Sequence, residues 1–182
     1  MTDTWLGWYF SDETETLRNG DGRQILVGIT HEVDCKPELC VRGLHASASV
    51  LDALEYSHGT ILWRVSLSGV IKHGDDKSCA TKRTYNARID ATDLLRTFAR
   101  KCALGVIQLW NAPQIVRDYL ETGNEELRDS ARSAAQDSAL AAARSAAWSA
   151  AQDAAQEEQR QLLEQMALEA IAGATRLRSI NK

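Results

Sequence analysis

The C-terminal third of the chain constrains the fold more than any other feature, because it contains neither glycine nor proline from residue 124 to residue 172. Alanine is its commonest residue, and Gln, Glu, Arg and Leu, which fill many other positions, are also strong helix formers. Thr122 and Glu125 have the T-x-x-E spacing of a capping box. The stretch therefore predicts one long helix that begins near Thr122 and ends near Gly173.

A straight helix of this length would run for roughly 70 Å, at about 1.5 Å per residue. It would then have to protrude, dimerise or bend back, which leaves two kinds of packing open: on its own head or on a second copy. Small residues recur every four positions from 132 to 155, and a period longer than about 3.6 favours a right-handed wrap over a heptad coiled coil. Large apolar residues return over 161–171, which indicates an ordinary packing segment.

Strand, turn and helix signals alternate through the preceding residues. The aromatic stretch 5–10 predicts a strand, and the segment 60–68 predicts another because its apolar residues alternate. Turn residues at 19–22 predict a hairpin. A polar strand is expected at 79–89, and helices are expected at 47–56, 91–104 and 113–121.

These signals predict an α+β protein with two parts. Residues 1–121 would form a head with a small mixed, mainly antiparallel sheet and short helices, and residues 122–182 an alanine-rich helical tail. We expect the tail to join copies of the chain into a homo-oligomer.

Composition and motifs exclude several classes of protein. The net charge of -4 is mild, and nothing resembles a secretion leader or a bilayer-spanning stretch. The histidines and the four cysteines lack metal-site spacing. No catalytic motif is recognisable. We therefore expect a cytoplasmic protein with free thiols and no membrane contact, metal or cofactor, and we assign no catalytic residue.

The first candidate site is the segment Gly43–Ser47 with the short helix that follows it. A glycine, a strand that carries His45 and Ser47, and a helix that ends at Tyr56 form a site-like arrangement. It resembles, over a short stretch, the nicotinamide pocket of compact ADP-ribosyltransferase-like folds. That resemblance implies an NAD-using enzyme, although the catalytic glutamate that such enzymes carry after a later strand is missing here. The alternative for His45 is a buried, hydrogen-bonded histidine.

The second candidate site is a charged turn followed by basic residues. Asp75 and Lys77, with Lys82 and Arg83 a few residues later, have the chemistry of an anion-binding site. They lie in a stretch, from Arg64 to Lys101, where cations outnumber acids. The alternative is a salt-bridged loop on a solvated sheet edge.

A set of short motifs, in a particular order, gives the chain a family resemblance: LRNGDGR, LCVRGLHAS, DALEY, ILWRVSLSG, HGDDKSCATKRT, LLRTFARKCAL, LWNAP and YLETGNEELRDSARSAA. The chain resembles an uncharacterised domain family of bacteriophage and bacterial genomes whose members commonly end in alanine-rich repeats. The resemblance extends to about Ala155. It implies a phage or prophage origin and the host cytoplasm, but it carries no activity.

Three hypotheses of function follow. The first is a phage accessory protein, without enzymatic activity, that binds a host protein or a signalling nucleotide and so counters a defence system. The second is an ADP-ribosyltransferase-like enzyme that uses NAD. The third is a structural or assembly protein that the tail joins into oligomers. Nucleic acid is a weaker candidate partner, because the charge balance does not favour it.

Overall fold

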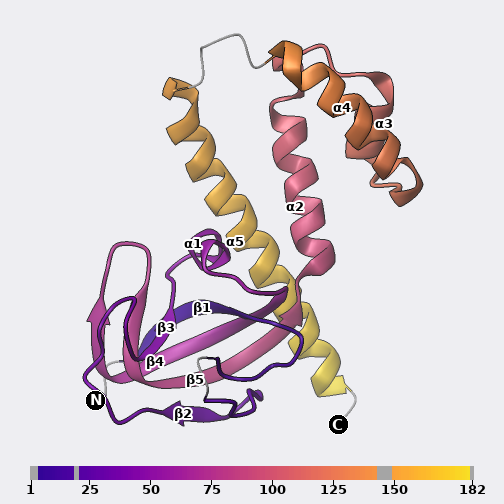
Figure 1. Ribbon diagram of the computed structural model, residues 1–182. Coiled ribbons are helices and arrows are strands. Elements are labelled where there is room, and N and C mark those ends of the chain that lie inside the picture. Colours follow the sequence, from indigo (N-terminus) through magenta and orange to yellow (C-terminus); the bar gives the residue numbers. More distant parts are fainter. Residues whose placement is uncertain (1–3, 19–20, 143–148, 181–182) are drawn as a thin grey trace. The chain divides into compact units, whose positions relative to one another are not determined.

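The computed structural model of the protein describes residues 4–18, 21–142 and 149–180 (Figure 1). Its contacts group the chain into two compact units. The first, which we call the sheet unit, comprises the described residues of Met1–Thr92 and Arg160–Lys182, and the second, the helical unit, those of Asp93–Gln159. The sheet unit is thus assembled from both ends of the chain, and the boundary expected after residue 121 falls inside the helical unit.

The sheet unit contains, in its described residues, five strands that form one sheet (Figure 1). The order is β1, β4, β5, β2, and β3 also pairs with β5. Every pairing is antiparallel, so the predicted α+β class with an antiparallel sheet is confirmed. The strands are β1 (Trp5–Ser11), β2 (Thr30–Glu32), β3 (Leu44–Ala46), β4 (Ile61–His73) and β5 (Ser78–Asp90).

The sheet curls back on itself next to β3. Ser47, directly after β3, exchanges both backbone hydrogen bonds with Trp8 of β1, at N···O distances of 2.8 and 2.9 Å. The segment 44–47 therefore pairs with β5 and touches β1, although β4 separates β5 from β1 in the sheet order. This closure places β1, β3 and β5 around a common interior.

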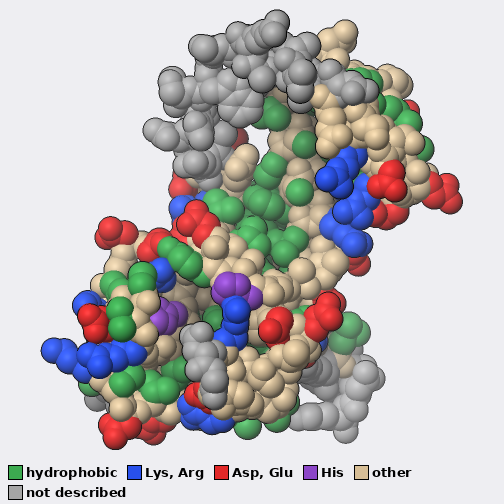
Figure 2. Space-filling model, viewed as in Figure 1, with side chains coloured by type: hydrophobic (Ala, Val, Ile, Leu, Met, Phe, Trp, Pro, Cys, Tyr) green, Lys and Arg blue, Asp and Glu red, His purple; other side chains and the backbone are tan. Residues whose placement is uncertain are grey.

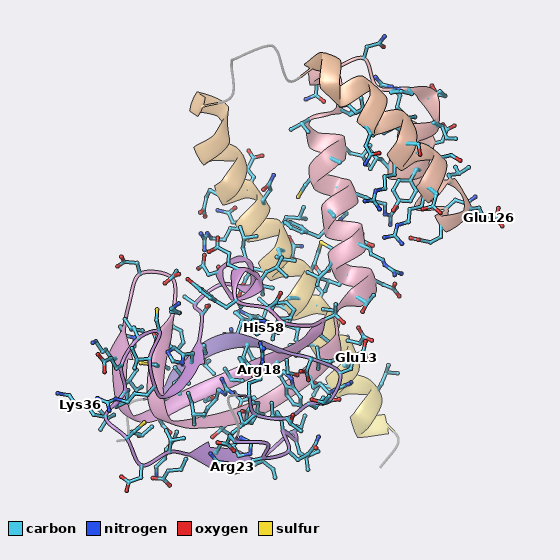
Figure 3. The ribbon with its side chains drawn as sticks, in the orientation of Figure 1. Glu13, Arg18, Arg23, Lys36, His58 and Glu126 are labelled. Carbon is cyan, nitrogen blue, oxygen red and sulfur yellow. The ribbon has the colours of Figure 1, made fainter. Side chains whose placement is uncertain are left out.

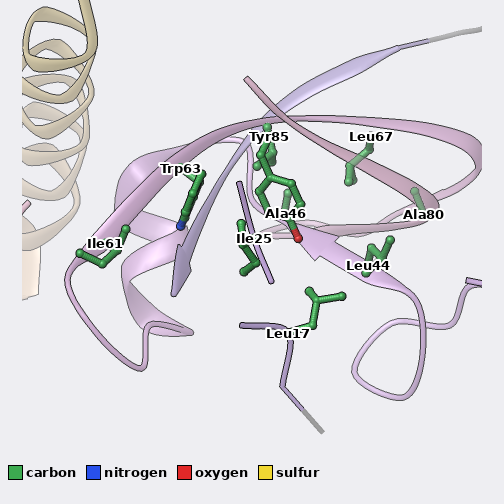
Figure 4. Packing of buried hydrophobic residues seen from close by; sticks show 10 residues of the cluster. Leu17, Ile25, Leu44, Ala46, Ile61, Trp63, Leu67, Ala80 and Tyr85 are labelled. Atoms are coloured by element: carbon green, nitrogen blue, oxygen red, sulfur yellow. The ribbon is translucent and has the colours of Figure 1, made fainter. Parts of the chain in front are cut away.

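The core of the sheet unit follows the two-residue period of β4. Ile61, Trp63, Val65 and Leu67 are all at most 3% exposed, as the alternation predicts. Trp63 and Tyr85 of β5 meet edge to face with ring centroids 5.3 Å apart (Figure 4). Leu17 and Ile25, which the loop between β1 and β2 contributes, complete this cluster.

That loop differs from the predicted hairpin. Thr16 and Gln24 form a single β-bridge, and no regular strand flanks the turn in the described residues. Leu17 and Ile25 are instead drawn into the core, which a flat two-stranded ribbon would not permit. Gly69 lies at a bulge, since the β4–β5 register shifts between Ser68 and Ile71 and Gly69 has a φ of +78°.

The helices of the first 127 residues begin and end close to their predicted positions. Ser49 caps α1 (Val50–Glu55) by accepting a hydrogen bond from the backbone N–H of Asp52. Asp90 accepts one from the N–H of Thr92 at the start of α2 (Thr92–Gly105). The remaining helices are η1 (Ile107–Leu109), α3 (Gln114–Thr122) and η2 (Glu125–Leu127).

The alanine-rich stretch forms α4 (Arg128–Ala142) and α5 (Ser149–Ile180). The predicted capping box is wrong: α3 ends at Thr122, Gly123 adopts a left-handed conformation, and Asn124 caps η2 instead. The predicted stop at Gly173 is also wrong, since α5 continues through it; a glycine inside a helix costs only about 1 kcal/mol.

Part of the tail prediction lies outside the described residues. Residues 143–148 join α4 to α5, and the side chains of 137–156 hold most of the four-residue repeat. The predictions of one continuous helix and of its right-handed wrap are therefore not tested. Among the helices that the structure does describe, none has both the length and the apolar character that crossing a bilayer needs.

The second half of α5 packs on the sheet unit, as expected for the segment 161–171. Leu163 is fully buried. The carboxylate of Glu164 accepts hydrogen bonds from the Trp8 indole N–H at 2.6 Å and from the Val50 backbone N–H at 3.0 Å. Arg160 donates to both carboxylate oxygens of Asp52, each at 2.6 Å. The C-terminal end of the chain thus fastens β1 to the first turn of α1, and we call these contacts the α5 clasp.

Candidate ligand-binding site

A cavity of about 750 Å³ lies within the sheet unit. Its walls come from the middle of β1, from the segment 40–47 that contains β3, from the end of α1, and from the loop after β1. Arg83 of β5 and Lys77, which precedes that strand, complete them. The closure between Trp8 and Ser47 explains why elements so far apart in the sequence share one interior.

Five of the seven predicted site residues line this cavity: His45, Ser47, Tyr56, Lys77 and Arg83. The structure thus brings the two candidate sites together into one.

The other two predicted residues, Asp75 and Lys82, do not line it. Asp75 is exposed in the turn between β4 and β5. Lys82 forms an ion pair with Glu32, with Nζ 3.1 Å from Oε1, as the salt-bridge alternative would have it. Along β5, Lys82 and Arg83 are adjacent, so their side chains point to opposite faces of the sheet and only Arg83 reaches the cavity.

Arg83 is the most unusual residue of the cavity, because its charged side chain is 2% exposed. Its guanidinium donates two hydrogen bonds to the Tyr85 hydroxyl, at 3.0 and 2.7 Å, and one to the backbone carbonyl of His45. It also lies 3.7 Å from the centroid of the Tyr9 ring. All of these partners are neutral, and within the described residues no carboxylate pairs with Arg83. The cavity wall therefore holds a buried positive charge that lacks a counter-charge.

Tyr85 and His31 extend this hydrogen-bonded group into the protein. The Nδ1 atom of His31 lies 3.2 Å from the Tyr85 hydroxyl. Burial raises the pKa of Tyr85, although the charge of Arg83 opposes the rise. Burial lowers the pKa of His31, and Arg23 and Arg83 lower it further. The phenol and the imidazole are thus both kept neutral, so neither balances the charge of Arg83.

His45, on β3, has a ring nitrogen without a partner. Its Nε2 atom is buried and makes no hydrogen bond within the described structure. Burial lowers the pKa of His45; a hydrogen bond to the Gly43 backbone opposes this, and Arg83 and Lys77 reinforce it. An unsatisfied buried polar atom costs about 1–3 kcal/mol, so a ligand group that reached this nitrogen would remove that penalty.

Tyr56 and Lys77, which both line the cavity, contact each other. The Tyr56 hydroxyl donates a hydrogen bond to the Asp76 carboxylate, and this bond lowers the pKa of Asp76. The ammonium group of Lys77 lies 3.6 Å from the centroid of the Tyr56 ring. Tyr56 is nevertheless 42% exposed. The ring is therefore held in orientation while much of its surface stays open.

The charge of the lining is positive. Four cations line the cavity, and one of them, Arg42, forms an ion pair with Glu38 at 3.2 Å. The one acid of the lining, Asp21, is bound to Arg23 at 2.6 Å. Figure 2 shows histidine and basic side chains gathered near the middle of this face of the sheet unit. The cationic side chains of the lining are Arg18, Arg42, Lys77 and Arg83.

Sequence reasoning did not identify several of these residues. Tyr9, Arg18, Asp21, Arg42 and His58 line the cavity without having been predicted. Arg18 and His58 project over the same face of the sheet unit (Figure 3). Arg18 and Asp21 flank a recognisable turn and Arg42 precedes Gly43, so their positions beside turn signals were the available clue.

The segment 15–97 matches the model of a protein family described as "Domain of unknown function (DUF7666)". The expected resemblance to an uncharacterised domain family is thereby confirmed. The matched segment includes all seven predicted site residues, whereas β1 and α5 lie outside it. Neither a curated protein nor a solved structure matches the chain. In the described residues no group of histidines, cysteines and acids could hold a metal ion.

Proposed function

We propose that the sheet unit is a binding module for a small ligand that carries a phosphoryl group. The observation that carries the proposal is the buried, unpaired guanidinium of Arg83 in the wall of a large cavity. A phosphoryl oxygen would supply the missing counter-charge, and charge-assisted hydrogen bonds to a guanidinium are about twice as strong as neutral ones.

The rest of the lining supports an anionic ligand. The other cations of the wall raise the local concentration of anions, and His45, whose backbone carbonyl binds Arg83, has a ring nitrogen without a partner. A carbonyl of His45 already orients the guanidinium. The ligand would therefore be held by groups that are in place before it arrives.

Calorimetric titration with pyrophosphate tests the proposal on the full chain. Replacing a charge-assisted contact costs about 1.5–3 kcal/mol, so Arg83→Gln should weaken binding by about 10- to 150-fold. Lys82→Gln is the matched control, because Lys82 is the next residue along β5 but lies outside the cavity. Lys77→Gln, at a half-buried position, provides a second variant should Arg83→Gln fail to fold. No measurable binding by the wild type, or equal losses in all three variants, would refute the proposal.

Such a module would suit a phage accessory protein that sequesters a signalling nucleotide and thereby counters a host defence. In that setting the chain would need to bind its ligand tightly without converting it. Recovery of the unchanged nucleotide after incubation with the purified protein, together with loss of free nucleotide on dialysis, is the expected result.

The alternative of an ADP-ribosyltransferase-like enzyme has one observation in its favour: His45 and Tyr56 line the same cavity. Against it, no glutamate is present among the described residues that line the cavity. Transfer of label from NAD to a lysate component, abolished by His45→Ala, would favour the enzyme over the binding module.

Oligomerisation through the tail is a further proposal. Alanine-rich α4 and the first half of α5 would supply the contact between copies, because the second half of α5 already packs on its own sheet unit. Light scattering on the full chain tests this, and a monomeric mass at all concentrations would contradict it.

A further inference from the structure

We infer that the ligand of this cavity is a nucleotide, and that its base stacks on Tyr56 while its phosphoryl groups meet Arg83 and Lys77. This inference rests on the proposed function and adds to it a second subsite with different chemistry.

The size of the cavity is the first argument. At about 750 Å³ it lies in the range, about 300–1,000 Å³, of sites that hold drug-sized organic ligands. A ligand that used only the cationic groups would leave most of this space unfilled. The ligand therefore has a substantial organic part besides its anionic part.

The distribution of exposed apolar surface is the second argument. Two large apolar side chains combine high exposure with a place in the cavity lining: Val41, which is 69% exposed, and Tyr56, which is 42% exposed. Covering them would remove apolar surface from water, which is favourable. An exposed aromatic ring is the surface on which a planar base stacks.

The anchoring of Tyr56 is the third argument. Its hydroxyl donates to Asp76 and the Lys77 ammonium lies over its ring. The ring therefore needs little further ordering when a base arrives, which reduces the entropic cost of binding. Lys77 belongs to both subsites, since its ammonium group contacts the Tyr56 ring and it is one of the cations of the lining. It is therefore suited to contact the phosphoryl groups of a ligand whose base is on Tyr56.

A comparison of adenosine diphosphate with pyrophosphate tests this inference, because the two share a diphosphate and differ by the nucleoside. Base–aromatic stacking predicts that adenosine diphosphate binds the wild type about 5- to 150-fold more tightly. Tyr56→Ala should weaken the binding of adenosine diphosphate much more than that of pyrophosphate, and so remove most of that advantage. Tyr56→Phe keeps the ring and should retain most of the advantage. Leu26→Ala, at an apolar residue that is 51% exposed and outside the cavity, is the control.

The outcomes separate the inference from the proposed function. If pyrophosphate binds but the nucleoside adds no affinity, or if Tyr56→Ala weakens both ligands equally, the base subsite is wrong and the anion site stands. If neither ligand binds the wild type, the proposed function itself fails. Guanosine and cytidine diphosphates should bind within about tenfold of adenosine diphosphate, since stacking tolerates every base.

Discussion

The α5 clasp makes the stability of the sheet unit depend on one carboxylate near the other end of the chain. Glu164 accepts hydrogen bonds from the indole of Trp8, which is fully buried, and from the backbone N–H of Val50. Arg64 lies 4.5 Å from the Trp8 ring, and its Nη1 atom is buried without a partner. Truncation of Glu164 to alanine would therefore leave two donors unsatisfied and would remove a negative charge that acts on Arg64.

The magnitude follows from these contacts. Hydrogen bonds to a charged group contribute about 1.5–3 kcal/mol each, and the two together predict that Glu164→Ala lowers the free energy of unfolding by about 3–6 kcal/mol. That is a large fraction of the roughly 5–15 kcal/mol by which domains are stable. At about 2–4 °C per kcal/mol for a chain of this size, the Tm should fall by about 6–24 °C.

Urea and thermal unfolding, followed by tryptophan fluorescence and by circular dichroism, measure this effect. Glu169→Ala is the matched control on the same helix, because Glu169 is exposed and accepts a hydrogen bond only from Gln165 among the described contacts. Its loss should cost no more than about 0.5 kcal/mol. If Glu164→Ala and Glu169→Ala unfold at the same urea concentration, the clasp does not stabilise the sheet unit and the reasoning is refuted.

Three further predictions concern the pH dependence of stability, a backbone conformation and a helix cap. Burial lowers the pKa of His45 in the folded protein, so the unfolded state takes up the proton first as the pH falls below about 6.5. The urea midpoint should therefore decrease from pH 7 to pH 5. His45→Gln should make the urea midpoint less dependent on pH. Gly69→Ala should cost about 1–2 kcal/mol or more, because the φ of +78° disfavours a Cβ and a threonine hydroxyl occupies its place, whereas Gly105→Ala, in open space, should cost nothing. Ser49→Ala should cost about 1–2 kcal/mol by removing the α1 cap; an unchanged urea midpoint would mean that Glu164 alone supports that helix end.

The strands of the sheet were predictable because their signals are local. The alternation of Ile61, Trp63, Val65 and Leu67 identified β4. The same locality explains the failure of the hairpin at residues 16–29. Turn residues predict a reversal of the chain, but whether regular strands follow depends on the core, and the core takes in Leu17 and Ile25.

The candidate site was predictable in its residue types but not in its arrangement. The charged turn and the segment around His45 both pointed to ligand chemistry, and the structure joins them. The pairing of Trp8 with Ser47, which creates the shared interior, has no local signal. Nor does the sequence distinguish Arg83 from Lys82: the difference between a buried cation and a surface ion pair arises from the pleat of β5 and from Tyr9, a residue on another strand.

The α5 clasp also has a consequence for the order in which the chain is made. Trp8 and Glu164 are separated by 156 positions, so a ribosome must add all of the intervening residues before the indole of β1 can meet its acceptor. Until then the nascent sheet unit has an uncovered face around Trp8 and a first helix without its carboxylate. Contacts of such long sequence separation slow folding. The residues of the helical unit are contiguous, so this unit can fold before the closing step of the sheet unit, which must wait until the second half of α5 has been made.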